Sequence, residues 1–503
     1  MKSIVILYDS NSDYADQKVF AGKSARERTL AWAENFASKD CIVKLSSCES
    51  VCKLLEKMSE LAKEKEADTI IFSFDDLPFI NVELTEKLTK QHSEYHSEYT
   101  FADGYPYGFT PEVINAGSIA IMAKLAETNL KEAGLKPVSR SCIYDFIKSD
   151  INSFEVETLI APSDWRLLRL SFSTANKSDF LSSSALSDIA DSKLSADELA
   201  KIASVSLPVL KSLPKFYSIQ ISDKVNFRTI YSPLSAGLKA SDKMMAYEDF
   251  ESLINQIVDL SKEAVISLSV YGEPLTHPDF LKFVECVLSK KNLCLFIESD
   301  GLLVSPELCE GLKTLVEKYS EKPNLPYPKF MMALQLDAIS ASCYKIIHEK
   351  ADDTDFQKAL QAVSMLSQAL PGCIYPQFVR MNENEAELEA FFRYWNEKTS
   401  PTAGNFIIQK YDSMAGALPE RKPADLSPLE RNVCWHLRRD MTILSDGTVP
   451  ACRACLASSS LGNVFNEDLE SVWHKNDDIL KEQIEKKLSV MCGKCDEFYT
   501  FNF

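Results

Sequence analysis

Short apolar runs alternate with longer amphipathic stretches through the first part of the chain. Ser3–Tyr8 and Asp68–Phe74 are rich in β-branched and aromatic residues, which favour strands. Ala25–Ala37 and Val51–Lys65 instead repeat apolar residues at helical spacing. This alternation predicts a parallel sheet covered by helices. We therefore expect an α/β domain over residues 1–150.

The same pattern returns later in the chain. A stretch rich in Ser, Asp, Ala and Lys comes first and predicts a helical connector over residues 151–214. Beyond it, strand-like runs are again separated by helical stretches. These runs are Phe216–Ile221, Val265–Val270, Leu293–Glu298, Phe330–Leu336, Gln377–Met381 and Phe406–Lys410. Six such units suit a partial (β/α)6 barrel over residues 215–421, although a doubly wound sheet would give the same pattern.

Charge and composition narrow the classes of partner. A formal net charge of -18 repels phosphate backbones and anionic lipid headgroups, so we expect neither a nucleic acid nor a membrane partner. No apolar run approaches the roughly 18 residues that cross a bilayer. The first apolar run ends at Tyr8 in polar residues, as a strand does and a signal peptide does not. These features predict a cytoplasmic protein.

Cysteines are concentrated in a small C-terminal module, residues 422–503. Cys492-Gly-Lys-Cys495 has the spacing that lets two thiolates bind one metal, and Cys452-Arg-Ala-Cys455 repeats it. Cys434 lies upstream, so five candidate ligands compete for four positions. Thiolates are compatible with zinc and with iron–sulfur clusters alike, so the cysteines could hold either kind of metal centre. The remaining nine cysteines are scattered singly, as small buried hydrophobes are.

The segments around these cysteines resemble the SPASM domain. The matching features are Cys434, Asp446-Gly447-Thr448-Val449-Pro450, Cys452, Leu461-Gly462-Asn463-Val464, Leu469 to Trp473, and Cys492-x-x-Cys495-Asp496. The resemblance implies one 4Fe-4S cluster on a cysteine quartet, with Cys455 as the spare. This quartet is Cys434, Cys452, Cys492 and Cys495. The two-cluster version of the domain has further cysteines after the final pair, and this chain has none there.

The middle region resembles the barrel of radical-SAM enzymes, which use S-adenosylmethionine (SAM). Tyr271-Gly272-Glu273-Pro274 follows the run Val265–Val270, as the motif that meets the amino group of SAM does in that family. Glu298-Ser299-Asp300-Gly301 and Leu334-Gln-Leu-Asp337-Ala338 resemble the ends of its next strands. The resemblance implies a SAM-like pocket. Its residues would be Gly272, Glu273 and Ser299.

The cysteines needed for radical chemistry are absent from the matching place. Radical-SAM enzymes hold a cluster on CxxxCxxC after the first strand, and this chain has Val225, Thr229 and Ser232 there. None of these side chains can replace a thiolate on iron. We therefore expect no reductive cleavage of SAM.

The N-terminal region offers a second candidate site at a strand end. Asp75-Asp76-Leu77-Pro78-Phe79 follows Asp68–Phe74, and paired carboxylates there suit a magnesium ion against phosphates. A solvated helix N-cap is the alternative. The region resembles nucleotidyltransferases and GT-A-like sugar-nucleotide enzymes, which implies that Asp75 and Asp76 bind a magnesium nucleotide. The loop after the first strand, residues 8–16, is acidic and lacks glycine, which would repel a triphosphate.

A chain with these regions in this order resembles a SPASM family of unknown function associated with spirochaetes. One hypothesis is an iron–sulfur protein whose barrel binds a protein or peptide partner. Another is an enzyme that transfers a nucleotide or sugar through the N-terminal domain. A third is a scaffold stabilised by zinc.

Overall fold

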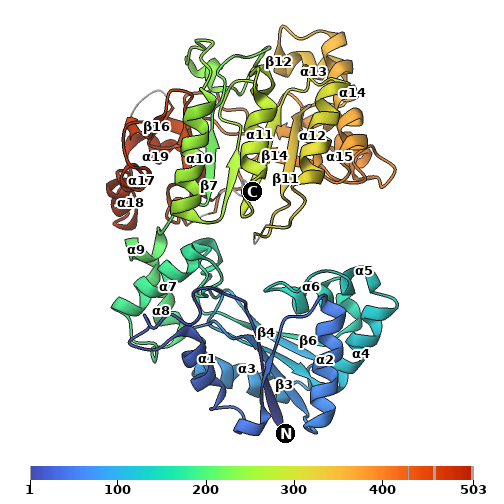
Figure 1. The fold of residues 1–503 in the computed structure, drawn as a ribbon, viewed down its shortest axis with the longest axis vertical. Helices are drawn as coiled ribbons and strands as arrows, with labels where there is room; N and C mark the ends of the chain where they lie inside the picture. The colour runs from blue at the N-terminus through green and yellow to red at the C-terminus, as the bar shows by residue number, and fades with distance from the viewer. Residues whose placement is uncertain (1, 324, 429, 457–459, 500–503) are drawn as a thin grey trace. The chain divides into compact units, whose positions relative to one another are not determined.

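The computed structural model describes residues 2–323, 325–428, 430–456 and 460–499. The chain forms two compact units, Met1–Ser212 and Leu213–Phe503, and Figure 1 shows both. The N-terminal unit therefore includes the range in which the sequence predicts a connector. The second unit contains the predicted barrel together with the C-terminal module.

A mixed six-stranded sheet forms the centre of the N-terminal unit, in the order β2-β1-β3-β5-β4-β6. The strands are β1 (Ser3–Tyr8), β2 (Ile42–Leu45), β3 (Thr69–Phe74), β4 (Tyr99–Asp103), β5 (Glu112–Asn115) and β6 (Val156–Ile160). The expectation of a parallel sheet is wrong at β5, which runs antiparallel to β3 and β4. Residues 104–111 are too few for the helical crossover that parallel strands need. Strand β6 lies in the range predicted to be a helical connector.

Helices cover both faces of this sheet (Figure 1). They are α1 (Ala25–Ala33), α2 (Val51–Glu64), α3 (Val82–Glu94), α4 (Ala116–Glu127), α5 (Lys131–Gly134) and α6 (Cys142–Lys148), followed by α7 (Lys177–Ile189), α8 (Ala196–Ser204) and α9 (Leu207–Leu210). Alternate residues of β1 point to opposite faces. Ile4 and Ile6 pack with residues of α2 and α4, whereas Val5 and Leu7 pack with Trp32 of α1. Burial on both sides explains why the run is continuously apolar.

The second unit contains a seven-stranded parallel sheet in the order β14-β13-β11-β10-β9-β7-β15. The strands are β7 (Phe216–Ile219), β9 (Ala264–Ser267), β10 (Leu293–Ser299), β11 (Phe330–Gln335), β13 (Ile374–Arg380), β14 (Ile407–Lys410) and β15 (Asp440–Ile443). From β7 to β14 each strand lies next to its successor in this sheet. A doubly wound sheet would reverse direction, so the order is that of a partial barrel.

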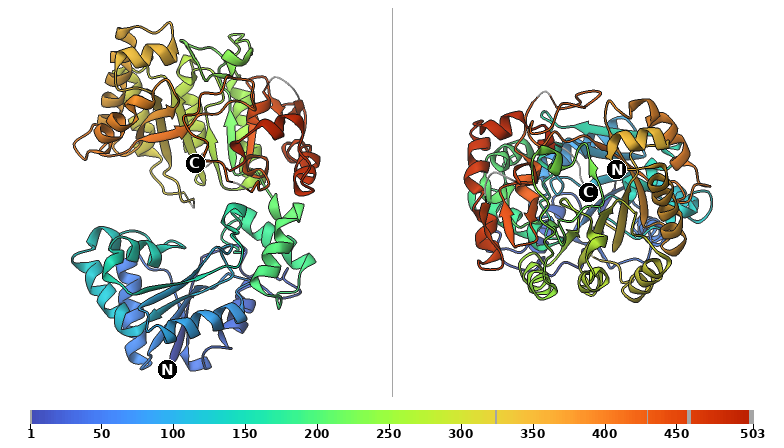
Figure 2. Two further views of the ribbon diagram at one scale, coloured as in Figure 1. Left: turned by 180° about the vertical axis from the view of Figure 1, so that it is seen from behind. Right: turned by 90° about the horizontal axis from the view of Figure 1, so that it is seen from above.

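Helices line one face of the barrel sheet, as Figure 2 shows. They are α10 (Tyr247–Ser261), α11 (Phe280–Leu288), α12 (Pro306–Lys318), α13 (Ala341–Ile347), α14 (Asp353–Ala369) and α15 (Leu388–Asn396). In β10, Leu295 and Ile297 pack in the main core with these helices, while Phe296 faces the other side. The next residue on that inner side is Glu298, so the strand alternation places a carboxylate inside the barrel.

The C-terminal module continues the barrel sheet. It contains α16 (Trp435–Arg439), β15, β16 (Thr448–Pro450), β17 (Ser460–Asn463), α17 (Leu469–His474), α18 (Asp477–Ile484) and α19 (Val490–Lys494). The turn at Asp446-Gly447 joins β15 to β16, but these strands do not pair with each other. Strand β15 pairs with β7 of the barrel, and β16 pairs with β17. This pairing fixes the module against the first barrel strand.

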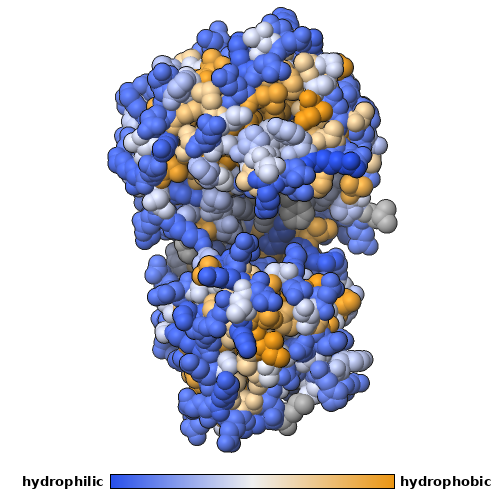
Figure 3. Space-filling model, turned by 90° about the vertical axis from the view of Figure 1, so that its right-hand side faces the viewer, coloured by the Kyte–Doolittle hydropathy of each residue, from blue (hydrophilic) through white to orange (hydrophobic). Residues whose placement is uncertain are grey.

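The visible face of each unit in Figure 3 is mostly hydrophilic, with apolar residues in small groups. Among the described residues, no helix combines the length and the hydrophobicity needed to cross a bilayer.

Candidate metal centre and barrel cavities

The cysteine quartet comes from three different places in the C-terminal module. Cys434 immediately precedes α16, and Cys452 follows β16. Cys492 lies within α19, and Cys495 follows that helix. The side chain of Cys455 lies outside what the structure describes. Because the ligand candidates come from three separate segments, a shared centre would tie the module together.

The quartet thiols lie near one another. The pKa of Cys434 is raised to about 12, mainly by burial, with smaller contributions from the neighbouring thiols of Cys452 and Cys492. Burial likewise raises the pKa of Cys495, with Cys434 among the groups that act on it. Buried thiols that disfavour each other's ionisation are the donors that a cationic centre would stabilise as thiolates.

Gln483 of α18 connects two members of the quartet. Its Oε1 accepts a hydrogen bond from the backbone N–H of Cys434 at 2.9 Å. Its Nε2 donates to the Sγ of Cys492 at 3.4 Å. A third donor, the backbone N–H of Glu497, lies 3.4 Å from the Sγ of Cys495. These donors and the thiols fit a thiolate-bound metal centre, because N–H groups directed at sulfur stabilise its negative charge.

The mouth of the barrel contains the residues that the sequence relates to SAM binding. One cavity of about 120 Å³ is bordered by residues of both motifs. They include Val225, Thr229, Ser232, Gly272, Glu273, Ser299 and Asp300. The three positions that would carry cysteines in a radical-SAM enzyme therefore do lie beside the Gly272–Glu273 turn. The cavity is smaller than the roughly 300–1,000 Å³ typical of small-molecule sites.

Glu273 is engaged by the chain itself. The hydroxyl of Ser299 and the backbone N–H of Leu275 donate to its Oε1, at 2.9 and 3.0 Å. The backbone N–H of Asp300 donates to its Oε2 at 2.8 Å. Burial, and then the charge of Asp300, raise the pKa of Glu273 well above its ordinary value. Glu273 thus ties the turn that follows β9 to the end of β10.

The loop at residues 225–232, which matches the cluster-binding loop of radical-SAM enzymes, packs its side chains against other parts of the barrel. Phe227 packs edge-on against His348, with ring centroids 4.9 Å apart. The hydroxyl of Tyr231 donates to Asp337 at 2.7 Å. The amide of Asn226 donates to Asp300 at 2.9 Å. These contacts hold the loop at the edge of the mouth cavity, which Phe227 and Tyr231 both line.

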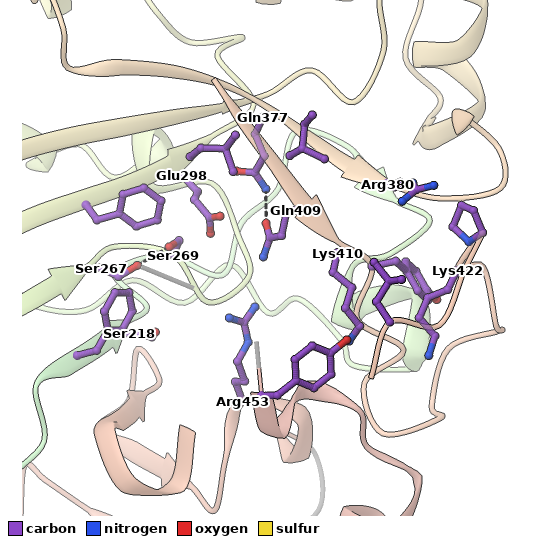
Figure 4. Close-up of a pocket in the computed structure, with 18 of the residues that line it drawn as sticks. Ser218, Ser267, Ser269, Glu298, Gln377, Arg380, Gln409, Lys410, Lys422 and Arg453 are labelled. Carbon is purple, nitrogen blue, oxygen red and sulfur yellow. Dashed lines mark hydrogen bonds between the residues drawn. The ribbon is translucent and has the colours of Figure 1, made fainter. Parts of the chain in front are cut away.

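A larger cavity of about 590 Å³ adjoins the mouth cavity, and the two share Glu298, Gln377, Gln409, Lys410 and Arg453 in their walls. Figure 4 shows Glu298, Gln377 and Gln409 on the strands, with Arg453 reaching in from the C-terminal module. Burial raises the pKa of Glu298, and the nearby guanidinium of Arg453 opposes that rise. Sequence reasoning missed Arg453, because no motif indicates that this side chain reaches the barrel cavity.

The two aspartates of the N-terminal strand end form ion pairs. The guanidinium of Arg140 binds both oxygens of Asp76, at 2.6 and 2.8 Å. The Nε of Arg26 lies 2.8 Å from Asp75, which also accepts from the backbone N–H of Ser10 at 3.0 Å. These pairs occupy the carboxylate oxygens that magnesium would need.

Comparison with known proteins relates the C-terminal module to a described domain family. Residues 434–496 match the SPASM family, described as an iron–sulfur cluster-binding domain. The second unit therefore combines a partial barrel of parallel strands with a C-terminal domain that matches the SPASM family.

An uncharacterized protein of Treponema pallidum (strain Nichols) is 37% identical over 372 residues. The match covers 72% of this chain and 99% of that protein. The chain therefore belongs to the same spirochaete family.

Two solved structures are similar at lower levels. The structure described as anSMEcpe with bound AdoMet is 15% identical, with a TM-score of 0.41, and covers 57% of this chain and 84% of that chain. A cytidylyltransferase from Leptospira borgpetersenii is 14% identical, with a TM-score of 0.32, and covers 40% of this chain and 93% of that chain. Similarities this distant assign no function, so the nucleotidyltransferase-like activity stays a prediction.

Proposed function

We propose that this protein carries one 4Fe-4S cluster on the cysteine quartet and that its barrel does not cleave SAM. The observation that carries the proposal is a contrast within one unit. Four half-buried thiols are near neighbours in the C-terminal module, whereas Val225, Thr229 and Ser232 border the barrel mouth. A bound cluster would supply electron transfer or structural cross-linking of the module.

The matched domain supports a cluster in preference to zinc, because residues 434–496 match a family described as an iron–sulfur cluster-binding domain. Among the described residues, no three quartet sulfur atoms all lie within 4.8 Å of one another.

The cytoplasm is the proposed location. The nine cysteines outside the C-terminal module form no disulfide in the structure. Unpaired thiols in this number are typical of a reducing compartment.

Metal analysis tests the cluster. Protein purified without oxygen should contain about four iron and four sulfide per chain and show a broad brown absorbance. Cys452→Ser should lose the cluster, whereas Cys455→Ser and the distant Cys373→Ser should keep it. Stoichiometric zinc without iron would overturn the proposal.

A reductive assay tests the proposal that the barrel does not cleave SAM. Reduced, iron-loaded protein incubated with SAM should form no 5′-deoxyadenosine, because no thiolate at the mouth can hold a SAM-binding iron. Formation of that product at more than the rate of a protein-free control would refute this part and leave the C-terminal cluster unaffected.

A further inference from the structure

The larger of the two barrel cavities has the size of a ligand site. Its volume of about 590 Å³ falls within the roughly 300–1,000 Å³ of small-molecule pockets. Its wall is divided chemically. Phe216, Phe296 and Ile407 provide an apolar side. Glu298 and Arg453 provide charges of opposite sign, while the other cations of the wall are each paired with a carboxylate, and these are Arg380, Lys410 and Lys422. A ligand that matches this wall must combine an apolar body with charged groups.

Arg453 is available to an anionic group. Figure 4 shows its guanidinium directed into the cavity, on the side facing Glu298 and Gln409. Within the described part of the chain it makes no hydrogen bond or ion pair, and Asp412 and Glu298 act on it only at longer range. A guanidinium offers five N–H donors, and donors removed from bulk water need acceptors. A carboxylate binds such a group through two parallel hydrogen bonds.

Gln377 provides an unused acceptor in the same cavity. Its side chain is 3% exposed, and its Nε2 donates to the Oε1 of Gln409 at 2.8 Å. Its own Oε1 is buried and has no hydrogen-bond partner among the described residues. Because a buried acceptor without a donor costs free energy, a ligand N–H would stabilise this arrangement. The adjacent Glu298 carboxylate makes a positively charged donor the best match.

We propose that the barrel cavity binds a free α-amino acid with a large apolar side chain. Its carboxylate binds Arg453, and its ammonium group binds Glu298 and Gln377. Its side chain packs against Phe216 and Phe296. Arg453 points toward Glu298 across the same cavity, which suits a ligand that carries both charges. This inference goes beyond the proposed function and requires no redox step.

A series of phenylalanine analogues tests the proposal on full-length, iron-loaded protein by calorimetry. L-phenylalanine should bind, whereas 3-phenylpropanoate lacks the ammonium group and phenethylamine lacks the carboxylate. Each analogue should bind about 30-fold more weakly or worse, because each leaves a charged protein group unmatched. Equal affinity for the three compounds would overturn the proposal. So would an absence of heat with phenylalanine, leucine and methionine at millimolar concentration.

Variants assign the two ends of the ligand. Arg453→Met should weaken phenylalanine binding about 30-fold and leave phenethylamine binding unchanged. Glu298→Gln should remove most of the preference for phenylalanine over 3-phenylpropanoate. The control is Arg393→Met, an exposed arginine of α15, which should bind like the unaltered protein. Unchanged phenylalanine binding by Arg453→Met would refute the assignment. If that variant fails to fold, the analogue series on the unaltered protein decides the matter.

Discussion

The Nε2 of Gln483 lies 3.4 Å from the Sγ of Cys492. Gln483 is 7% exposed, so water competes little for this contact. An amide N–H directed at a cluster sulfur favours the reduced, more negative state of a cluster. Such outer contacts also affect retention of the metal, typically by about 10–100-fold.

We therefore expect Gln483→Ala to lower the midpoint potential of the reconstituted cluster. It should also accelerate loss of iron to a chelator by about tenfold or more. Voltammetry and the decay of visible absorbance measure the two effects. Gln361→Ala, on an exposed site of α14, is the control. If both variants behave like the unaltered protein, Gln483 has no role at the centre.

The Arg140–Asp76 pair predicts a large effect on the stability of the N-terminal unit. Asp76 is fully buried, and Arg140→Met would leave its carboxylate without a counter-charge. Breaking a buried pair in this way costs about 3–5 kcal/mol. Urea unfolding followed by circular dichroism measures it. The control is Arg166→Met, whose arginine is 61% exposed and pairs with Asp164, and which should cost less than about 1 kcal/mol.

The same ion pairs predict that the N-terminal unit does not bind a magnesium nucleotide. Arg26 and Arg140 occupy Asp75 and Asp76, the two carboxylates that the sequence nominates for the metal. Titration of CTP with magnesium into the protein should give the same heat as magnesium alone, up to millimolar concentration. Saturable heat that depends on the nucleotide would contradict this prediction and support the nucleotidyltransferase hypothesis.

The strands were largely predictable because their apolar runs are buried on one or both faces. Ser3–Tyr8 is predicted with the bounds that β1 has, and each of the six predicted barrel runs overlaps a strand of the sheet. The antiparallel direction of β5 was not predictable from its apolar run, because it depends on the short loop that precedes the strand. The seventh strand, β15, is not among the predicted barrel runs, because the Asp-Gly turn that follows it says nothing about which strand each arm will meet.

Among the candidate site residues, only those that belong to a recognisable motif could be picked out from the sequence. The C-terminal cysteines and the Gly272–Glu273 turn have recognisable spacing, and the structure places each group together. Gln483, Arg453 and Arg140 have no such signal. Each acts on a residue or cavity wall distant in sequence, and only the tertiary fold brings them there.

Replacing Gly272 tests how tightly the backbone packs at the barrel mouth. Its φ is +92°, and a Cβ there would lie 2.2 Å from the carbonyl oxygen of Ser222. Gly272→Ala should therefore cost about 1–2 kcal/mol from the left-handed conformation and about 1–3 kcal/mol more from the clash. Gly237→Ala is a matched control, with φ +98° and no atom within 4 Å of the added Cβ. Thermal unfolding should separate the two variants. Equal losses would show that the loop moves freely away from Ser222.

Glu112 predicts a pH dependence of stability in the N-terminal unit. Burial raises its pKa to about 7 from an ordinary value of 4.5, although a hydrogen bond from Tyr99 opposes the rise. Between these two pH values the folded chain keeps a proton that the unfolded chain releases. The contribution of Glu112 to stability is therefore fully present below about pH 4.5 and is lost as the pH rises to about 7. Above that pH the loss is constant, at up to about 3 kcal/mol.

Glu112→Gln should remove this dependence, because the amide mimics the protonated acid and can still accept the Tyr99 hydroxyl that lies 2.5 Å from Oε1. The variant should match the unaltered protein below about pH 4.5 and exceed its free energy of unfolding by up to about 3 kcal/mol at pH 8. Urea unfolding at several pH values measures the difference. Glu132→Gln, an exposed site on α5 with the same change in charge, should follow the unaltered profile. A Glu112→Gln difference that stays constant with pH would show that this carboxyl ionises alike in the folded and unfolded chains.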